Sequence, residues 1–170
     1  VDGIAFTYSE PAVWLEYVLD VSELAHAAGL YTVYVSNSFV TDEALELMAP
    51  HVDVLCSDIK SLSDAFYQDI CKPATVSQVL GSIDKAQQLG IHVETRTNII
   101  PGKNDDIDEL TRIAQWIHDH LGADSPLPDP GRERPHDRQC DIGLQQGHAH
   151  FAQGIADIVF ADPALAAYFL

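Results

Sequence analysis

The stretch GIAFTYSEP, residues 3–11, contains the unit from which the rest of the chain is built. An apolar run that ends at Tyr8 predicts a buried strand, and the carboxylate of Glu10 follows it almost at once. Pro11, which is favoured in the first turn of a helix, opens a segment of helical period that reaches Ala28. The stretch therefore predicts a strand that passes directly into a helix, with a carboxylate at the carboxyl end of the strand.

Apolar runs typical of strands recur three more times, with segments of helical period between them. The predicted strands are residues 3–8, 30–35, 52–57 and 91–100, and the predicted helices are residues 11–28, 41–49, 61–70, 75–89 and 105–121. The first helix places Val13, Trp14, Tyr17, Val18, Val21, Leu24, Ala25 and Ala28 on one apolar stripe. Strands that alternate with amphipathic helices predict βαβ crossovers and a parallel sheet. We expect an α/β fold of about four βα units, either an open sheet or a partial (β/α) barrel.

The βα rhythm stops after Asp124. The next residues are rich in Pro, Gly, His and Arg and have no clear period, and residues 151–170 have the composition of one or two short helices broken at Pro163. We therefore predict a partial barrel over residues 1–124 and an irregular tail over residues 125–170.

Charge and cysteine usage narrow the class of protein. The 26 acidic and 9 basic residues give a formal net charge of −17, which repels phosphate backbones and anionic membrane surfaces. We therefore expect neither nucleic acid nor membranes as partners. The three cysteines are scattered without a CxxC pair, which argues against a disulfide framework and indicates a reducing compartment. The composition predicts a soluble, cytoplasmic protein.

Polar side chains follow the first three predicted strands and interrupt the fourth, and we expect them at the sheet edge where ligands collect in parallel α/β folds. They are Ser9 and Glu10, then Ser36, Asn37 and Ser38, then Asp58 and Lys60, and lastly Glu94, Arg96 and Asn98. Because unpaired buried charges are costly, the four charged residues of the last two sets either neutralise one another or bind a zwitterionic ligand. For such a ligand, Glu10 would accept hydrogen bonds from the amine, and Lys60 or Arg96 would meet the carboxylate.

The order of the motifs TYSEP (7–11), VSNS (35–38), DIK (58–60) and RTNIIPG (96–102) resembles that of radical S-adenosylmethionine enzymes. The resemblance extends over residues 3–124 and is to the glycyl-radical-enzyme activases, the group of pyruvate formate-lyase activating enzyme, and to AmmeMemoRadiSam-system enzymes. It implies reductive cleavage of S-adenosyl-L-methionine at a [4Fe-4S] cluster to a 5′-deoxyadenosyl radical. That radical would abstract hydrogen from a protein or small-molecule substrate, with flavodoxin or ferredoxin as a reductant.

The same resemblance implies roles for single residues. Glu10 matches the carboxylate that holds the S-adenosylmethionine amino group, and the remaining motifs match segments beside the cofactor. The implied cofactor-binding residues are Ser9, Glu10, Ser36, Asn37, Asp58 and Arg96, and the candidate catalytic residues are Asp58 and Lys60.

Two features depart from the family pattern. The family's CxxxCxxC cluster loop precedes the Glu-Pro strand, where this sequence has only a few residues, and Cys56, Cys71 and Cys140 are placed too differently to replace it. We therefore expect a fragment without the cluster ligands. The likeness is also lost after residue 124, which indicates either a frameshifted or a divergent tail.

Three alternatives stay open. A catalytically incompetent fragment, or a protein that binds a small ligand or a partner, would have the same strand-end residues without the redox chemistry. A Schiff-base enzyme of the aldolase type would use the amine of Lys60. A zinc site in the tail would use His136, Cys140, His148 and His150, but their spacing matches no standard module, and no metal ligand is predicted.

Overall fold

A computed structural model describes residues 3–72 and 74–122. The elements are β1 (Gly3–Phe6), η1 (Pro11–Trp14), α1 (Leu15–Ala27), β2 (Tyr31–Ser36), α2 (Asp42–Met48), β3 (Val54–Asp58), α3 (Asp64–Phe66), η2 (Tyr67–Cys71), α4 (Val76–Gln88), β4 (His92–Arg96) and α5 (Ile107–Leu121). The predicted tail and the four residues of the zinc alternative lie outside the described residues.

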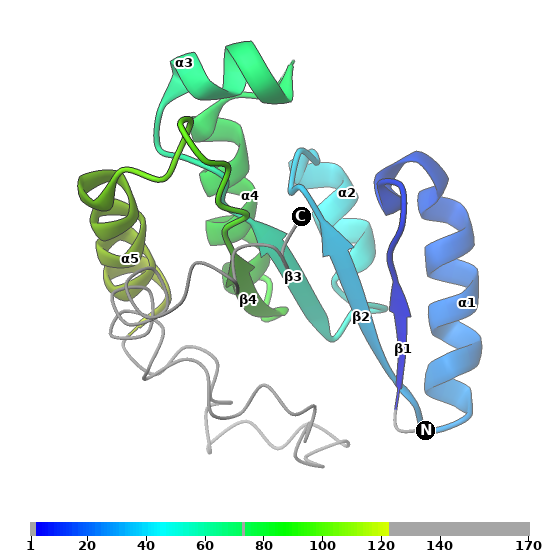
Figure 1. Cartoon of the computed structure of the whole chain (residues 1–170). Helices are drawn as coiled ribbons and strands as arrows, with labels where there is room; N and C mark the ends of the chain where they lie inside the picture. Colours follow the sequence, from blue (N-terminus) through cyan, green and yellow to red (C-terminus); the bar gives the residue numbers. More distant parts are fainter. Residues whose placement is uncertain (1–2, 73, 123–170) are drawn as a thin grey trace, which may run out of the picture.

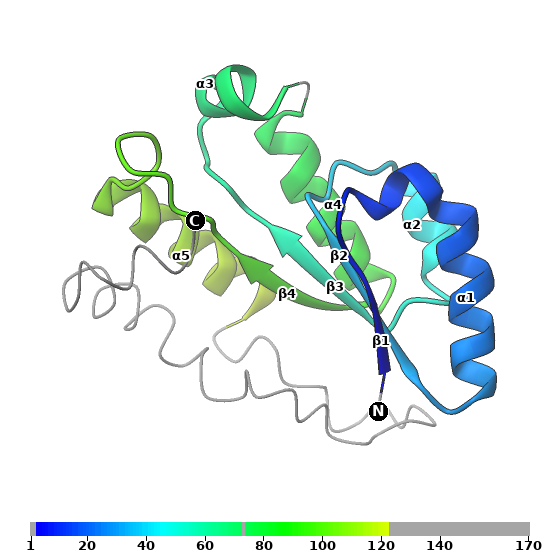
Figure 2. The ribbon, with the colours of Figure 1, turned by 45° about the vertical axis from the view of Figure 1, so that its right-hand side comes forward.

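The four strands form one parallel sheet in the order β1-β2-β3-β4. Helices α1, α2, α4 and α5 cover one face of this sheet, and α3 lies beyond the carboxyl ends of the strands (Figures 1 and 2). Each parallel pair requires a crossover connection, and the helices provide it. The predicted α/β fold with four parallel strands is confirmed.

Side chains alternate between the two faces of each strand, and this alternation divides the apolar residues into two groups. On the helix-covered face, Tyr34 and Leu55 belong to the main core together with buried residues of α1, α2, α4 and α5. On the other face, Val33, Val54 and Cys56 form a smaller apolar cluster. The parallel register aligns Cys56 with Glu94 and Asp58 with Arg96, so these charged residues continue the second face toward the carboxyl edge.

The first predicted helix, residues 11–28, is in fact two elements. Its first turn is the 3₁₀ helix η1, and at Trp14 the backbone (φ −138°, ψ 43°) leaves the helical region before α1 begins. Because the interruption breaks the helical period between η1 and α1, an apolar stripe predicted for one continuous helix does not coincide with the buried face of the two elements. Val13, Tyr17 and Leu24 are 77%, 61% and 70% exposed. The buried face of α1 consists of Val18, Ser22 and Ala25.

The fourth predicted strand, residues 91–100, ends earlier than expected, at Arg96. The segment after β4 is held as a loop by the buried side chain of Asn104, which accepts a hydrogen bond from Ile100 N at 2.6 Å. Its amide group donates to the carbonyl oxygens of Lys60 at 2.6 Å and Asn98 at 2.9 Å. One side chain therefore ties the chain after β3 to the chain after β4 and fixes the backbone of Lys60.

Replacing Asn104 with Ala should lower the free energy of unfolding by about 2–4 kcal/mol, because it leaves three backbone groups without their partner. Urea denaturation measures the change. The matched control is Asn98→Ala, which removes an exposed amide side chain and should change stability by less than about 0.5 kcal/mol. Equal effects of the two substitutions would contradict the role assigned to Asn104.

Candidate functional site

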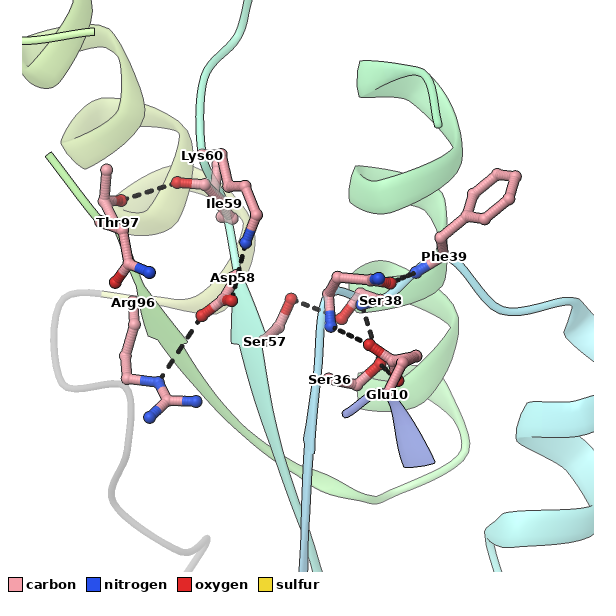
Figure 3. Close-up of polar contacts among 12 residues, drawn as sticks. Glu10, Ser36, Ser38, Phe39, Ser57, Asp58, Ile59, Lys60, Arg96 and Thr97 are labelled. Carbon is pink, nitrogen blue, oxygen red and sulfur yellow. Dashed lines mark hydrogen bonds and ion pairs between the residues drawn. The ribbon is translucent and has the colours of Figure 1, made fainter. Parts of the chain in front are cut away.

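Glu10 lies between β1 and η1, and its carboxylate is held from two directions (Figure 3). Oε1 accepts a hydrogen bond from the hydroxyl of Ser36 at 2.7 Å and a longer one from Ala12 N at 3.4 Å. Oε2 accepts from Asn37 N at 2.9 Å. The carboxylate thereby joins the carboxyl ends of β1 and β2. Since an ionised carboxylate has about four acceptor positions, Oε2 keeps capacity for one more donor.

The turn that delivers Glu10 is strained. Tyr8 and Ser9 have φ values of 59° and 32°, in the left-handed region that non-glycine residues rarely adopt. Each such residue costs roughly 1–2 kcal/mol, and strain of this kind gathers at functional sites. Ser38, after β2, also has a positive φ, of 59°. Both turns border the Glu10 carboxylate.

Three buried hydroxyl groups connect the Glu10 carboxylate to β3. Ser36 Oγ donates to Glu10 and accepts a hydrogen bond from Ser38 N at 2.9 Å, and Ser38 Oγ donates to Ser57 Oγ at 2.6 Å (Figure 3). The role of Ser57 was missed at the level of sequence, because a serine inside an apolar strand gives no signal of its partner. The chain of hydroxyls fixes the spacing between the ends of β1, β2 and β3.

The amide of Asn37 faces a different set of groups. Its Oδ1 accepts a hydrogen bond from Phe39 N at 2.8 Å, which fixes the side chain and identifies the amide nitrogen as the outward end. Within the described residues, no contact occupies that nitrogen. Asn37 therefore presents two N–H groups at the carboxyl edge of the sheet.

A second charged group lies at the ends of β3 and β4. Lys60 Nζ is 2.8 Å from Asp58 Oδ2, and Arg96 Nε is 3.8 Å from Asp58 Oδ1 (Figure 3). Asp58 and Lys60 are largely buried, whereas the Arg96 side chain is 52% exposed. The ion pairs that the sequence predicted here therefore exist in part, and within residues 3–72 and 74–122 the outer donors of Arg96 and Lys60 have no further ion-pair partner.

Glu94 lies deeper on the same face and takes another partner. Its Oε2 accepts from the thiol of Cys56 at 3.6 Å. Burial, and next the nearby Glu94 carboxylate, raise the pKa of the Cys56 thiol to about 12. Cys56 is therefore a neutral thiol at physiological pH.

The structure places the predicted residues at one edge of the sheet in two neighbouring groups. Glu10, Ser36 and Asn37 form one group, and Asp58, Lys60 and Arg96 form the other, with Ser9 in the exposed turn beside Glu10. Their roles toward a cofactor stay a prediction. The arrangement offers a carboxylate and an amide donor in the first group and cationic donors in the second, which suits a zwitterionic ligand.

Residues 1–117 match the model of the Radical SAM superfamily. The chain belongs to this superfamily. It is 39% identical over 125 residues to an uncharacterized protein of Methanocaldococcus jannaschii, covering 74% of this chain and 36% of that protein. It is 23% identical over 121 residues to the (2S)-3-sulfopropanediol dehydratase activating enzyme of Klebsiella oxytoca, covering 71% and 38%. The chain thus spans little more than a third of the length of these relatives.

Solved structures show the same fold. A domain of pyruvate-formate lyase-activating enzyme from Bacteroides vulgatus superposes with a TM-score of 0.64 at 18% identity, over 92% of this chain and 96% of that domain. A structure of TYW1 with a lysine-pyruvate adduct bound superposes with a TM-score of 0.52 at 21% identity, over 68% of this chain and 38% of that chain. The predicted partial barrel and the predicted likeness to activases are confirmed.

The superfamily implies S-adenosylmethionine and an iron–sulfur cluster. The described residues include candidate ligands for the first group but not for the second. The described cysteines are Cys56, whose thiol is neutral and buried, and Cys71, on η2. No group of three or more metal-binding side chains gathers within residues 3–72 and 74–122. A cluster needs converging thiolates, so this part of the chain does not fit one.

Within residues 3–72 and 74–122, no helix has the length and apolar character to cross a membrane.

Ser9→Gly should raise the free energy of unfolding by about 0.5–1 kcal/mol, because glycine adopts a positive φ without the steric cost that serine meets. The control is Ser77→Gly within α4, where glycine is unfavourable and stability should fall by a similar amount. Thermal or urea denaturation compares the two variants. Destabilisation by Ser9→Gly would contradict the assignment of strain to this turn.

Proposed function

We propose that this chain binds S-adenosylmethionine at the carboxyl edge of its sheet, as the cofactor-binding part of a radical SAM enzyme of the activase type. Superfamily membership and an activating enzyme among the relatives support the class. The observation that carries the proposal is the pairing of a carboxylate acceptor at the ends of β1 and β2 with cationic donors at the ends of β3 and β4.

The ammonium of the cofactor would be bound by Glu10. Three of its acceptor positions are filled by Ser36, Ala12 and Asn37, and the remaining one on Oε2 suits an N⁺–H donor. In this proposal Ser36 positions the carboxylate, since its hydroxyl is already committed to Glu10. The strained turn at Ser9 sets the height of Glu10 above the sheet.

The carboxylate of the cofactor would be bound by the second group. Lys60 uses one of its three N–H bonds on Asp58, and the half-exposed guanidinium of Arg96 keeps a planar fork for a carboxylate. A ribose hydroxyl of the cofactor would accept a hydrogen bond from the amide nitrogen of Asn37, in the first group. Asp58 holds Lys60 and Arg96 in place.

When bound, S-adenosylmethionine supplies a sulfonium whose reductive cleavage gives a 5′-deoxyadenosyl radical for hydrogen abstraction. The residues of this chain would hold the two charged ends of the cofactor at the carboxyl edge of the sheet. The proposed partners of the whole enzyme are a protein or small-molecule substrate and a reductant such as flavodoxin or ferredoxin. A cytoplasmic location is proposed with them.

The Schiff-base alternative is not favoured by the geometry of Lys60. An amine that attacks a carbonyl must be neutral, and such lysines are desolvated or lie beside other cations. Lys60 instead lies 2.8 Å from the Asp58 carboxylate, which stabilises the ammonium. Lys60 therefore serves better as a fixed positive charge than as a nucleophile.

Isothermal titration of the chain with S-adenosylmethionine should detect binding, and Glu10→Gln should weaken it at least about tenfold, because the ammonium loses a charged acceptor. The control is Glu46→Gln, which makes the same charge change at an exposed pair with Lys85 and should leave the affinity unchanged. Circular dichroism confirms that both variants are folded. No binding by the parent chain, or equal affinity of parent and Glu10→Gln, would overturn the proposal.

A further inference from the structure

A recess of about 210 Å³ opens beside the proposed cofactor site, between the ends of the strands and the π-helical turn η2. Its lining residues are Asn37, Lys60, Tyr67, Ile70, Cys71, Ala74, Asn98 and Ile100. Two of them, Asn37 and Lys60, belong to the cofactor-site groups, and the remainder come from η2 and the loops that follow η2 and β4. Single π-helical turns occur frequently at functional sites.

The hydroxyl of Tyr67 is the buried polar group of this recess. The residue is 2% exposed, and its oxygen accepts a hydrogen bond from Lys60 N at 3.2 Å. None of the contacts within the described residues provides an acceptor for its proton. Burial raises the pKa of Tyr67, so the proton stays in place and the hydroxyl remains a donor. A buried donor without an acceptor is unfavourable unless a ligand or water satisfies it.

Two further side chains of the recess, Asn37 and Lys60, offer donors. Asn37 presents its amide nitrogen, and Lys60 keeps N–H bonds beyond the one given to Asp58. Ile70, Ala74 and Ile100 supply apolar wall. The recess therefore favours a ligand with acceptor oxygens on a small apolar body. A cavity of roughly 150 Å³ accommodates benzene, so this one suits a group of roughly six to ten non-hydrogen atoms.

A larger cavity of about 330 Å³ lies between η2 and α5, and each of the two cations that line it is paired with a carboxylate. Lys103 lies 3.3 Å from Asp69, and Arg112 pairs with the buried Glu109. Glu109 also accepts hydrogen bonds from Ser61 Oγ and Leu62 N, each at 2.6 Å. These contacts hold the loop after β3 against α5.

We propose that the recess beneath η2 is the substrate subsite of this enzyme, and that it takes a small carboxylic acid or carboxamide whose acceptor oxygen meets the hydroxyl of Tyr67. Tyr67 is then a specificity-determining residue that touches the substrate, while Ile70 and Ile100 select for its apolar body. The identification of the ligand as a substrate rests on the proposed function, because the recess borders the site assigned to S-adenosylmethionine.

The thiol of Cys71 reports on occupancy, because it lines the recess and is partly exposed. In the full chain carrying Cys140→Ser, the rate of Cys71 alkylation by iodoacetamide in mildly alkaline buffer is followed by peptide mass spectrometry. Isobutyramide and isobutyrate should each slow the alkylation at least about threefold at saturating concentration, as mass action requires of a ligand that covers the thiol. Isobutylamine, which has a similar apolar body but no acceptor oxygen, should not.

The variant Tyr67→Phe keeps the ring and removes the hydroxyl, and it should abolish most of the protection by isobutyramide. Tyr34→Phe is the matched control, since it removes another buried hydroxyl, one without a hydrogen-bond partner in the described structure, and should leave the protection intact. Equal protection by isobutylamine, or unchanged protection in Tyr67→Phe, would overturn the subsite.

Parallel reactions with S-adenosylmethionine separate this proposal from the proposed function. If S-adenosylmethionine alone protects Cys71 as fully as isobutyramide does, and isobutyramide adds nothing, the recess belongs to the cofactor and the subsite is wrong. If isobutyramide protects but calorimetry detects no S-adenosylmethionine, the acceptor-binding recess stands and the proposed function fails. If S-adenosylmethionine binds and no acyl probe protects, the function stands and the subsite fails.

Discussion

The parallel register of the four strands is the constraint on which the rest of the structure depends. It places Ser36 beside Ser57 and Asp58 beside Arg96, so that residues distant in the sequence meet at one edge. All four strands point the same way, and every strand therefore ends at this edge. Because the described helices cover the face opposite to the apolar cluster around Val33, the candidate ligand-binding groups lie on the second face and at the strand ends.

The edge is held in shape by side chains that bind backbone. Glu10 joins the ends of β1 and β2, and Asn104 joins the loops that follow β3 and β4. Glu109 fastens the segment after β3 to α5. Each of these groups satisfies donors or acceptors that would otherwise be buried without partners, which is why a loop-rich edge can be rigid. The positive φ values at Tyr8 and Ser9 show that this geometry is kept at a cost in local strain.

The sequence predicted which side chains lie at the carboxyl edge of the sheet, because strand-end positions follow from hydrophobic patterning. Glu10 and Asp58 each stand where an apolar run stops, and a parallel sheet necessarily brings such positions to one edge, whereas Arg96 lay inside the predicted fourth strand and ends it only in the structure. The pattern was less informative about which face of the first helix is buried and about which group each charged side chain contacts. It assigned Val13 and Tyr17 to the buried stripe, since it could not register the 3₁₀ turn before α1. It placed Glu94 among the neutralising charges, whereas Glu94 pairs with Cys56.

The sequence by itself determined the fold class, the βα order and the strand-end residues, because these depend on local periodicity and on the fixed topology of parallel sheets. Only the tertiary structure decided which groups remain free to bind a ligand. The open acceptor position on Glu10, the outer donors of Lys60 and the unmatched hydroxyl of Tyr67 are what is left after hydrogen bonds between distant segments are made. Whether such a donor or acceptor finds a partner depends on the exact distances between elements, and no periodicity in the sequence encodes those distances.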